Sequence, residues 1–248
     1  MSMVGTRTII PMGTAMDEGR TWPLSTGEGP RILPLFAWLS PSYPVGCYAY
    51  SHTLEWAVEA GDVTDGVTLV AWLNEMLTLG FGRNDAIVLS HAYRAAERGD
   101  EHVLDAVNEL ALALSPSAEL YLETSQQGRS FLDASFAAWP SPRLMALEGP
   151  VAFPVAVGMT AAAHGIPLPI TLEAYLFGLG QTLVSAALRL APIGQTTGMR
   201  VCAALAATAQ AVAREAIDLS LDDIGGSTFR ADLGSFHHEN QYTRLFRS

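Results

Sequence analysis

The chain has 248 residues, 49% of them hydrophobic, so it can bury a sizeable core in one large domain or two small ones. Its formal net charge of −11 argues against a general nucleic-acid binder and against binding to an anionic membrane. All 14 residues counted as Lys or Arg are arginine, which excludes Schiff-base chemistry on lysine and any phosphate-binding loop that depends on lysine.

The hydrophobic pattern predicts an all-α protein. Apolar residues recur at helical spacing along most of the chain, with short breaks and no convincing run of alternating strand residues. We expect a variable or flexible leader over residues 1–29, where Gly, Thr and Met are frequent. A single-domain compact multi-helix bundle is expected over residues 30–235, and a separate C-terminal tail over residues 236–248.

A first helix is predicted near Ile32–Leu39, and it is followed by a stretch that concentrates aromatic and polar side chains, Pro41–Trp56. The prolines and Gly46 predict a sharp turn, then a helix over about residues 46–60 that ends at Gly61. One face of this helix would carry Tyr50, Thr53, Leu54 and Ala57. Another would carry Tyr48, Ser51, Glu55 and Glu59. Spacing alone is equally that of an ordinary loop followed by an amphipathic helix.

Caps and breaks predict the helices that follow. Trp139–Pro142 is the strongest break, but neither side has an independent composition, so we do not expect a domain boundary there. The first of these helices covers residues 65–79 with Asp65 as N-cap, and the second runs from Asn84 or Asp85 to the break at Arg98–Asp100. The helix over residues 116–137 has Ser115 as N-cap and Pro116 at its first position. The other predicted helices cover residues 103–114, 151–164, 171–190 and 198–219.

The loop between the last two of these helices reads A-P-I-G-Q-T-T-G-M over residues 191–199. Gln195 can cap the adjoining helix or contact a partner, although Gly and Pro commonly mark a plain interhelix turn.

The C-terminal residues His237–Ser248 interleave two arginines with Tyr, Leu and Phe, which are residue types typical of binding surfaces. This composition predicts a docking segment, although chain ends commonly fray. His237, His238 and Glu239 also suit a metal, but adjacent side chains rarely complete a site alone, so we favour hydrogen bonds or partner contacts for them.

Paired-carboxylate catalysis by Glu55 and Glu59 is one further interpretation, because the two residues would share a helix face. No nucleophile or acid–base partner accompanies them, so we expect a solvent-facing or partner-facing role. Cys47 and Cys202 are too far apart in sequence for a close-spaced metal or redox motif. Together with the lack of a secretion signal and of a membrane-spanning run, they predict a cytoplasmic protein.

Three segments resemble the UreF family of urease accessory proteins, in the same order along the chain. They are Pro41–Trp56, the Pro-Ile-Gly-Gln run that ends at Gln195, and the tail residues His238, Glu239, Gln241, Tyr242, Arg244, Leu245, Phe246, Arg247 and Ser248. The resemblance covers about residues 31–248. The chain departs from the family at Cys47, where a small residue is common, and at Glu119-Leu120-Tyr121, where Glu-Leu-Arg is common.

This resemblance implies an all-α homodimer that is a scaffold or chaperone and not an enzyme. Proteins similar to UreF join UreD (also called UreH) and the GTPase UreG, and the assembly promotes nickel insertion into apo-urease. The resemblance implies no catalytic, cofactor-binding or metal residues and no stably bound cofactor, since the complex handles the nickel. It implies that the tail engages UreD and that the opening aromatics help recruit UreG. The partner-binding residues are then Tyr48, Tyr50, Ser51, Glu55, Gln195, His238, Glu239, Tyr242, Arg244, Leu245, Phe246 and Arg247.

Two other hypotheses remain open from the residues. One is a cytosolic helical metal-dependent hydrolase that uses Glu55, His91, His237 or His238. The other is a purely structural helical dimer, which would not depend on nickel-handling partners.

Overall fold

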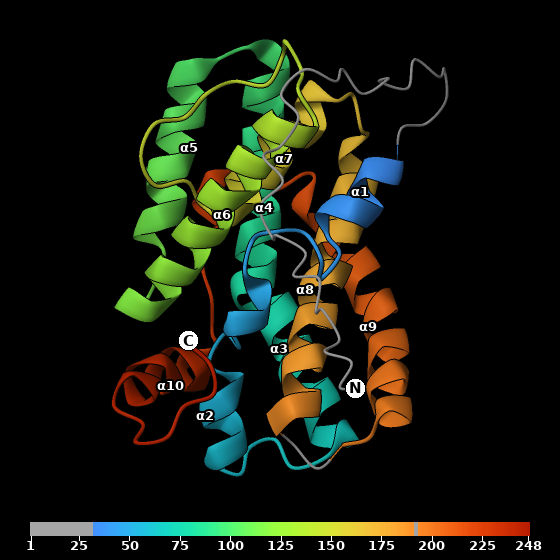
Figure 1. Ribbon diagram of the computed structural model, residues 1–248, viewed down its shortest axis with the longest axis vertical. Coiled ribbons are helices and arrows are strands. Elements are labelled where there is room, and N and C mark those ends of the chain that lie inside the picture. The colour runs from blue at the N-terminus through green and yellow to red at the C-terminus, as the bar shows by residue number, and fades with distance from the viewer. Residues whose placement is uncertain (1–31, 191–192) are drawn as a thin grey trace, which may run out of the picture. The chain divides into compact units, whose positions relative to one another are not determined.

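The computed structural model describes residues 32–190 and 193–248, so the predicted leader and the loop residues 191 and 192 lie outside the described residues. Within the described part every regular element is a helix, which confirms the all-α prediction (Figure 1). The elements are α1 Leu33–Trp38, the 3₁₀ helix η1 Cys47–Ala49, α2 Leu54–Glu59, α3 Gly66–Leu79, α4 Phe81–Arg98, α5 Glu101–Ala113, α6 Ala118–Ala138, α7 Phe153–Ala163, α8 Leu168–Leu190, α9 Gln195–Ala216, the 3₁₀ helix η2 Leu221–Asp223 and α10 Phe229–Glu239.

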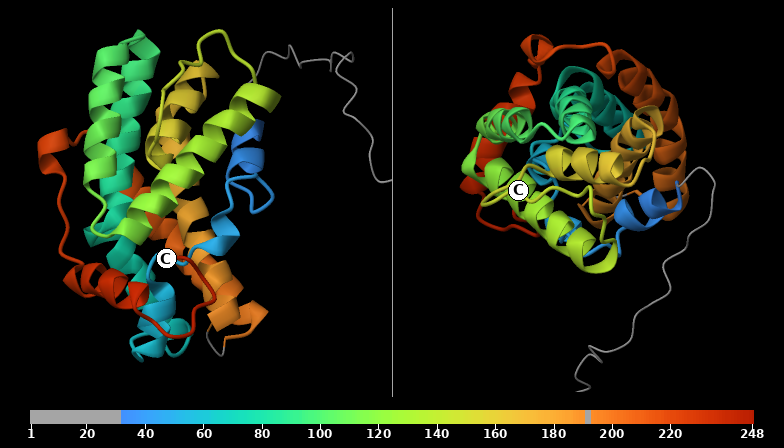
Figure 2. Two further views of the ribbon diagram at one scale, coloured as in Figure 1. Left: turned by 60° about the vertical axis from the view of Figure 1, so that its left-hand side comes forward. Right: turned by 90° about the horizontal axis from the view of Figure 1, so that it is seen from above.

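The core is built around α4, which packs against α3, α5, α7, α8 and α9 (Figure 2). The closest partner, α7, has no charged residue, and every residue from Pro154 to Ala163 is buried. A helix that is apolar on all sides belongs inside a protein. At the crossing, a Cβ on Gly158 would stand 2.6 Å from the carbonyl oxygen of Leu89, so only glycine allows this approach. The segments on both sides of the Trp139–Pro142 break contribute to one hydrophobic core.

Several predicted helix ends are confirmed because their signals are local. The Asp65 carboxylate accepts hydrogen bonds from the amides of Val67 and Thr68, both at 2.9 Å, and so caps α3. Gly61 and Gly99 follow α2 and α4 in the left-handed conformation, with φ of 81° and 69°.

Other predicted boundaries are wrong. The helix α6 is capped by Ser117, whose hydroxyl accepts from Leu120 N at 3.3 Å, and it begins after Pro116 instead of at it. The helix α4 begins at Phe81, because one residue, Gly80, both ends α3 and starts α4. The helices α8 and α9 each begin three residues earlier than predicted.

The predicted continuous helix over residues 46–60 does not exist. The chain makes one turn of 3₁₀ helix, breaks, and starts α2 only at Leu54. At the break His52 and Thr53 have φ values of 50° and 65°, and this left-handed conformation is unfavourable for residues other than glycine. The break removes the predicted helical faces, and Tyr50, Ser51 and Glu55 are all buried.

The C-terminal residues begin as a helix and end as an irregular segment. The predicted boundary between residues 235 and 236 falls inside α10, so His237 and His238 are helical and not extended. Residues 240–248, here called the C-terminal segment, then run back beside the opening stretch (Figure 2). None of the helices in the described ranges is both long and apolar enough to cross a bilayer.

Candidate functional site

The opening stretch Pro41–Trp56 and the C-terminal segment meet through backbone hydrogen bonds. The amide of Arg247 donates to the carbonyl oxygen of Ala49 at 2.8 Å, and the amide of Ser51 donates to that of Ser248 at 3.1 Å. The Ser51 hydroxyl donates to the same Ser248 oxygen. Two of the three segments singled out in the sequence are therefore one structural unit.

Glu55 holds this unit together from inside. Its carboxylate is only 7% exposed, and it accepts hydrogen bonds from Leu245 N at 2.6 Å and from Phe246 N at 2.9 Å. The expected solvent- or partner-facing role of a Glu55–Glu59 pair is therefore wrong for Glu55. Glu59 is exposed, and its carboxylate accepts from the side-chain amide of Gln241. The two carboxylates consequently do not act as a catalytic pair.

His238 lies fully buried between two carboxylates. Its Nδ1 is 2.6 Å from Oε2 of Glu119, and its Nε2 is 3.2 Å from Oε2 of Glu55. Glu119 also pairs with Arg244. Because both ring nitrogens face carboxylates, neither is left for a metal ion. Across residues 32–190 and 193–248 no group of three or more His, Cys, Asp or Glu side chains could hold one.

The residues of the alternative hydrolase hypothesis are only partly brought together. Glu55 and His238 are in contact, but His91 Nε2 bonds to the carbonyl oxygen of Leu219 at 3.0 Å, and His237 stacks on Trp56 with ring centroids 5.6 Å apart. No common reaction centre results.

The predicted partner-binding residues divide into a buried and an exposed set. Those that contact their own chain and are buried are Tyr50, Ser51, Glu55, His238 and Phe246. Those available at the surface are Tyr48, Gln195, Tyr242, Arg244, Leu245 and Arg247, with Glu239 half-buried. Gln195 is the first residue of α9 and has none of the contacts that join the opening stretch to the C-terminal segment.

Arg189 of α8 supports the exposed part of the opening stretch. Its guanidinium donates to the carbonyl oxygen of Tyr48 at 2.7 Å and lies 4.3 Å above the ring centroid of Phe246. Tyr48, which is 73% exposed, is thus presented by a fixed backbone. Beside it an open groove of about 700 Å³ runs between the opening stretch and α6, with Arg129 and Arg247 in its wall.

Helix α10 presents an apolar stripe on its outer side, formed by Phe229, Leu233 and Phe236. The spacings of four and three residues put these side chains on one helix face. The inner side of α10 packs on α2, where the guanidinium of Arg230 lies 5.0 Å from the ring centroid of Trp56 and Gly234 closely approaches the same ring. This stripe adjoins the exposed residues of the C-terminal segment in the chain.

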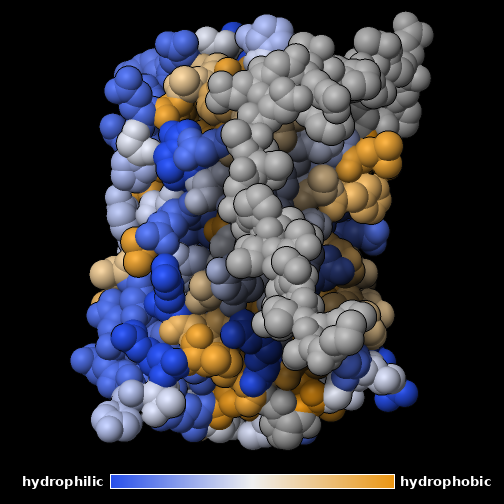
Figure 3. All heavy atoms as spheres, viewed as in Figure 1, coloured by the Kyte–Doolittle hydropathy of each residue, from blue (hydrophilic) through white to orange (hydrophobic). Residues whose placement is uncertain are grey.

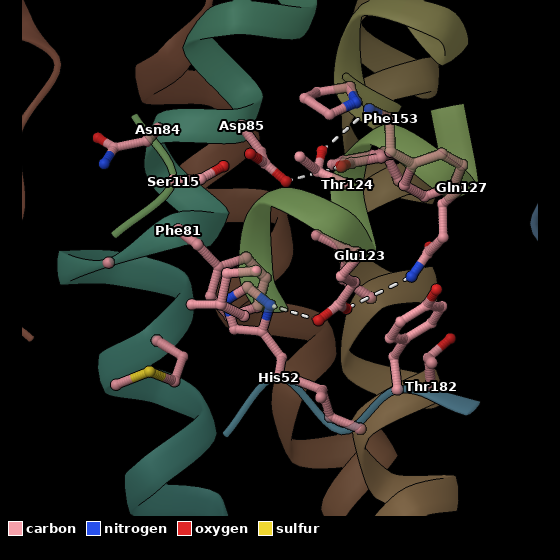
Figure 4. A pocket seen from close by; sticks show the side chains of 18 of the residues that line it. His52, Phe81, Asn84, Asp85, Ser115, Glu123, Thr124, Gln127, Phe153 and Thr182 are labelled. Carbon is pink, nitrogen blue, oxygen red and sulfur yellow. Dashed lines mark hydrogen bonds and ion pairs between the residues drawn. The ribbon is translucent and has the colours of Figure 1, made fainter. Parts of the chain in front are cut away.

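Next to this unit lies a partly open cavity of about 310 Å³ whose walls include ionisable side chains (Figure 4). His52 comes from the opening stretch, Asp85 from α4 and Glu123 from α6. The ring of His52 lies 3.8 Å from that of Phe81, and its Nδ1 is 3.4 Å from Oε2 of Glu123. The other ionisable wall residues are Cys47, Tyr50, Tyr175 and Asp232.

Burial shifts the titration of these groups. It raises the pKa of Asp85 to about 6, against the opposing effects of a 2.7 Å hydrogen bond from Tyr175 and of His52. Burial alone would lower the pKa of His52, but the charge and hydrogen bond of Glu123, with Asp85 and Asp232, outweigh it and raise that pKa. Burial, together with the charge of Asp85, raises the pKa of Tyr175 well above its usual value. Asp85 and His52 therefore both keep a proton to a higher pH than their ordinary pKa values allow.

Sequence reasoning missed Glu123, Arg189, His52 and Asp85 as site residues. For Asp85 a signal existed, because it shares its helix face with the buried Val88, Leu89 and Ala92. The partners of Glu123 and Arg189 lie too far away in sequence for any local pattern to reveal them.

Comparison with known proteins finds relatives over most of the chain. A family model described as UreF matches residues 63–206. The protein named urease accessory protein UreF from Xanthobacter autotrophicus is 65% identical over 221 residues, covering 88% of this chain and 91% of that protein. The one from Azorhizobium caulinodans is 62% identical over 227 residues, covering 90% and 98%. A third, from Methylobacterium sp. (strain 4-46), is 58% identical and covers 87% and 88%.

Proposed function

Because this chain belongs to the UreF family of urease accessory proteins, we propose that it is the scaffold that joins UreD (also called UreH) and the GTPase UreG to promote nickel insertion into apo-urease. Its family places it in urease maturation, as an accessory factor and not an enzyme. The assembly would form in the cytoplasm, which agrees with Cys47 and Cys202 both being free thiols.

The observation that carries the proposal is the C-terminal segment together with the stripe on α10. Tyr242 is fully exposed and Leu245 is 53% exposed, whereas the neighbouring Phe246 is buried and anchors the backbone. Arginine and aromatic residues on a fixed backbone are typical of binding hot spots. We assign this surface to UreD (UreH). The segment is already ordered by contacts with its own chain. Docking would therefore cost less conformational entropy than it would for a frayed chain end.

A second surface, around Tyr48 and the groove beside α6, is assigned to UreG. Arg247 in the groove wall suits an acidic group on a partner, whereas Arg129 is already paired with Asp133. A homodimer is also part of the proposal, and the apolar side chains Leu33 and Phe36, exposed on α1, support a contact with a second copy (Figure 3).

Nickel is the cargo of the complex in this proposal, and no cofactor is resident in this chain. The test is co-purification of UreD (UreH) with the full chain carrying Tyr242→Ala and Leu245→Ala together. We expect capture to fall at least about tenfold, because truncating hot-spot side chains commonly costs more than about 1.4 kcal/mol. The matched control is Val67→Ala, which removes a 79% exposed apolar side chain from the start of α3.

Unchanged capture by the double variant would reject the assigned surface. Equal loss in the Val67 control would show a non-specific effect, and no capture even by the unsubstituted chain would favour the purely structural dimer. Deleting residues 236–248 is a poorer test, because it also removes His238 and Phe246 from the folded interior.

A further inference from the structure

Glu123 faces the C-terminal segment and the cavity at the same time. Its Oε2 accepts a hydrogen bond from the hydroxyl of Ser248 at 2.5 Å, and the same oxygen is 3.4 Å from Nδ1 of His52. Ser248 is a buried residue of the C-terminal segment, whereas His52 lines the cavity (Figure 4). One carboxylate oxygen is thus shared by two donors from different parts of the molecule.

The backbone beside His52 is held in an unfavourable conformation. His52 and Thr53 both have positive φ, which is most costly for a β-branched residue such as Thr53. The Thr53 hydroxyl lines the cavity, is buried, and has no hydrogen-bond partner among the described residues. Ser51, which directly precedes His52, is fixed by two hydrogen bonds to the carbonyl oxygen of Ser248. A conformation of this kind persists only where its surroundings impose it, and here the C-terminal segment fixes Ser51, the residue directly before the strained pair.

We infer that Glu123 couples the packing of the C-terminal segment against α6 to the position and charge of the His52 imidazole in the cavity. The coupling is a property of this chain alone. Its use as a signal, by which a partner docked on the segment changes the cavity, rests on the proposed function.

The sharing of Oε2 gives the coupling a direction. The Ser248 hydroxyl is the closer donor, so its hydrogen bond partly neutralises the charge of Oε2 and holds this oxygen away from a closer contact with the imidazole. If the hydroxyl is removed, Glu123 can approach His52 and stabilise its protonated form. The other charged groups that face His52 are Asp85 from α4 and Asp232 from α10, and neither bonds to Ser248. The side chain of Ser248 therefore influences the charge of His52 through Glu123.

The test is an NMR titration of His52 in the full chain, with its signal identified by its absence from His52→Gln. In Ser248→Ala we expect the titration midpoint of His52 to move upward, since Glu123 becomes free for the imidazole. In Glu123→Gln it should fall, because burial then acts on His52 with less opposition. The matched control is Tyr242→Ala, from the same segment but without contact to Glu123, and it should leave the midpoint in place.

Ser248→Thr keeps a hydroxyl, so it should restore the original midpoint and show that the effect is not one of folding. An unchanged or lowered midpoint in Ser248→Ala would overturn the coupling, and so would an equal upward shift in Tyr242→Ala or in Ser248→Thr. The titration needs no partner. Failure of UreD (UreH) capture in the Tyr242 and Leu245 test would therefore reject the proposed function and leave the coupling standing.

Discussion

At the scale of single residues, Glu55 shows how the folded context reverses a local expectation. Its position in the first turn of α2 suggests a solvated carboxylate, but the structure makes it the acceptor for two backbone amides and an imidazole. Buried donors that lose their acceptor carry their full desolvation cost. Glu55 is consequently a structural residue that supports the exposed ones around it.

We predict that Glu55→Ala lowers the free energy of unfolding by about 3 kcal/mol, because Leu245 N, Phe246 N and His238 lose a buried acceptor. Glu55→Gln should lose less, since its amide oxygen still accepts. Glu59→Ala, at an exposed position, should cost about 0.5 kcal/mol or less. Urea denaturation of the three variants measures these differences. Equal stability of Glu55→Ala and Glu59→Ala would mean that the C-terminal segment is not held by Glu55.

Asp85 leads to a prediction about pH. The unfolded carboxyl loses its proton near 3.8, whereas the folded one keeps it to about 6. Between these values the folded state binds more protons, so the free energy of unfolding falls as the pH rises. The full loss from this one group amounts to at most about 3 kcal/mol. Asp85→Asn, which still offers an acceptor to Tyr175, should remove this part of the pH dependence.

Urea denaturation at several values between about pH 4 and about pH 7 checks this prediction. Asp85→Asn should lose less stability than the unsubstituted chain over this range. A conservative comparison is Asp105→Asn on the exposed side of α5, which should leave the slope unchanged. Parallel curves for the chain and Asp85→Asn would show that the Asp85 carboxyl does not titrate differently in the folded and the unfolded state.

At the scale of secondary-structure elements, the sequence predicts well where the determinants are local. The helix α3 is one example, since its capping residue Asp65 bonds to amides two and three residues away. The glycine that ends α4 is another. In the opening stretch, by contrast, the expected helix is broken at His52 and Thr53, where Ser51 is held by a residue 197 positions away. No propensity within a short window contains that information.

The arrangement of the candidate site could be predicted only in part, for the same reason. The aromatic and arginine composition of the C-terminal segment predicts a binding surface, and its resemblance to UreF implies the partners, and both stay predictions. Which of its residues face outward was not predictable, because that depends on packing against Glu119 and Glu123 in α6. His52 and Asp85 gain their importance only from the cavity that distant helices enclose.

At the scale of the whole molecule, the proposal assigns separate surfaces to separate partners. The α10 stripe with Tyr242 and Leu245 forms one, and Tyr48 with its groove, whose wall includes Arg247, forms the other. Arg189 ties the two together, since it bonds to the Tyr48 backbone and lies on the ring of Phe246. Arg189 contacts the backbone of Tyr48 and not its ring, so a substitution confined to the exposed ring leaves this connection in place. Such a substitution should affect one partner without disturbing the other.

We predict that Tyr48→Ala retains UreD (UreH) capture and loses at least about tenfold in UreG recruitment, because an exposed aromatic ring can act as a hot spot for its own surface only. The loss of a side chain that is 73% exposed should change the free energy of unfolding by about 0.5 kcal/mol or less. Co-purification of the ternary complex and urea denaturation of the chain alone measure both effects. Val67→Ala again serves as the exposed apolar control. Parallel loss of both partners in Tyr48→Ala would show one continuous surface, and a large loss of stability would make Tyr48 a structural residue whose apparent effect on recruitment is indirect.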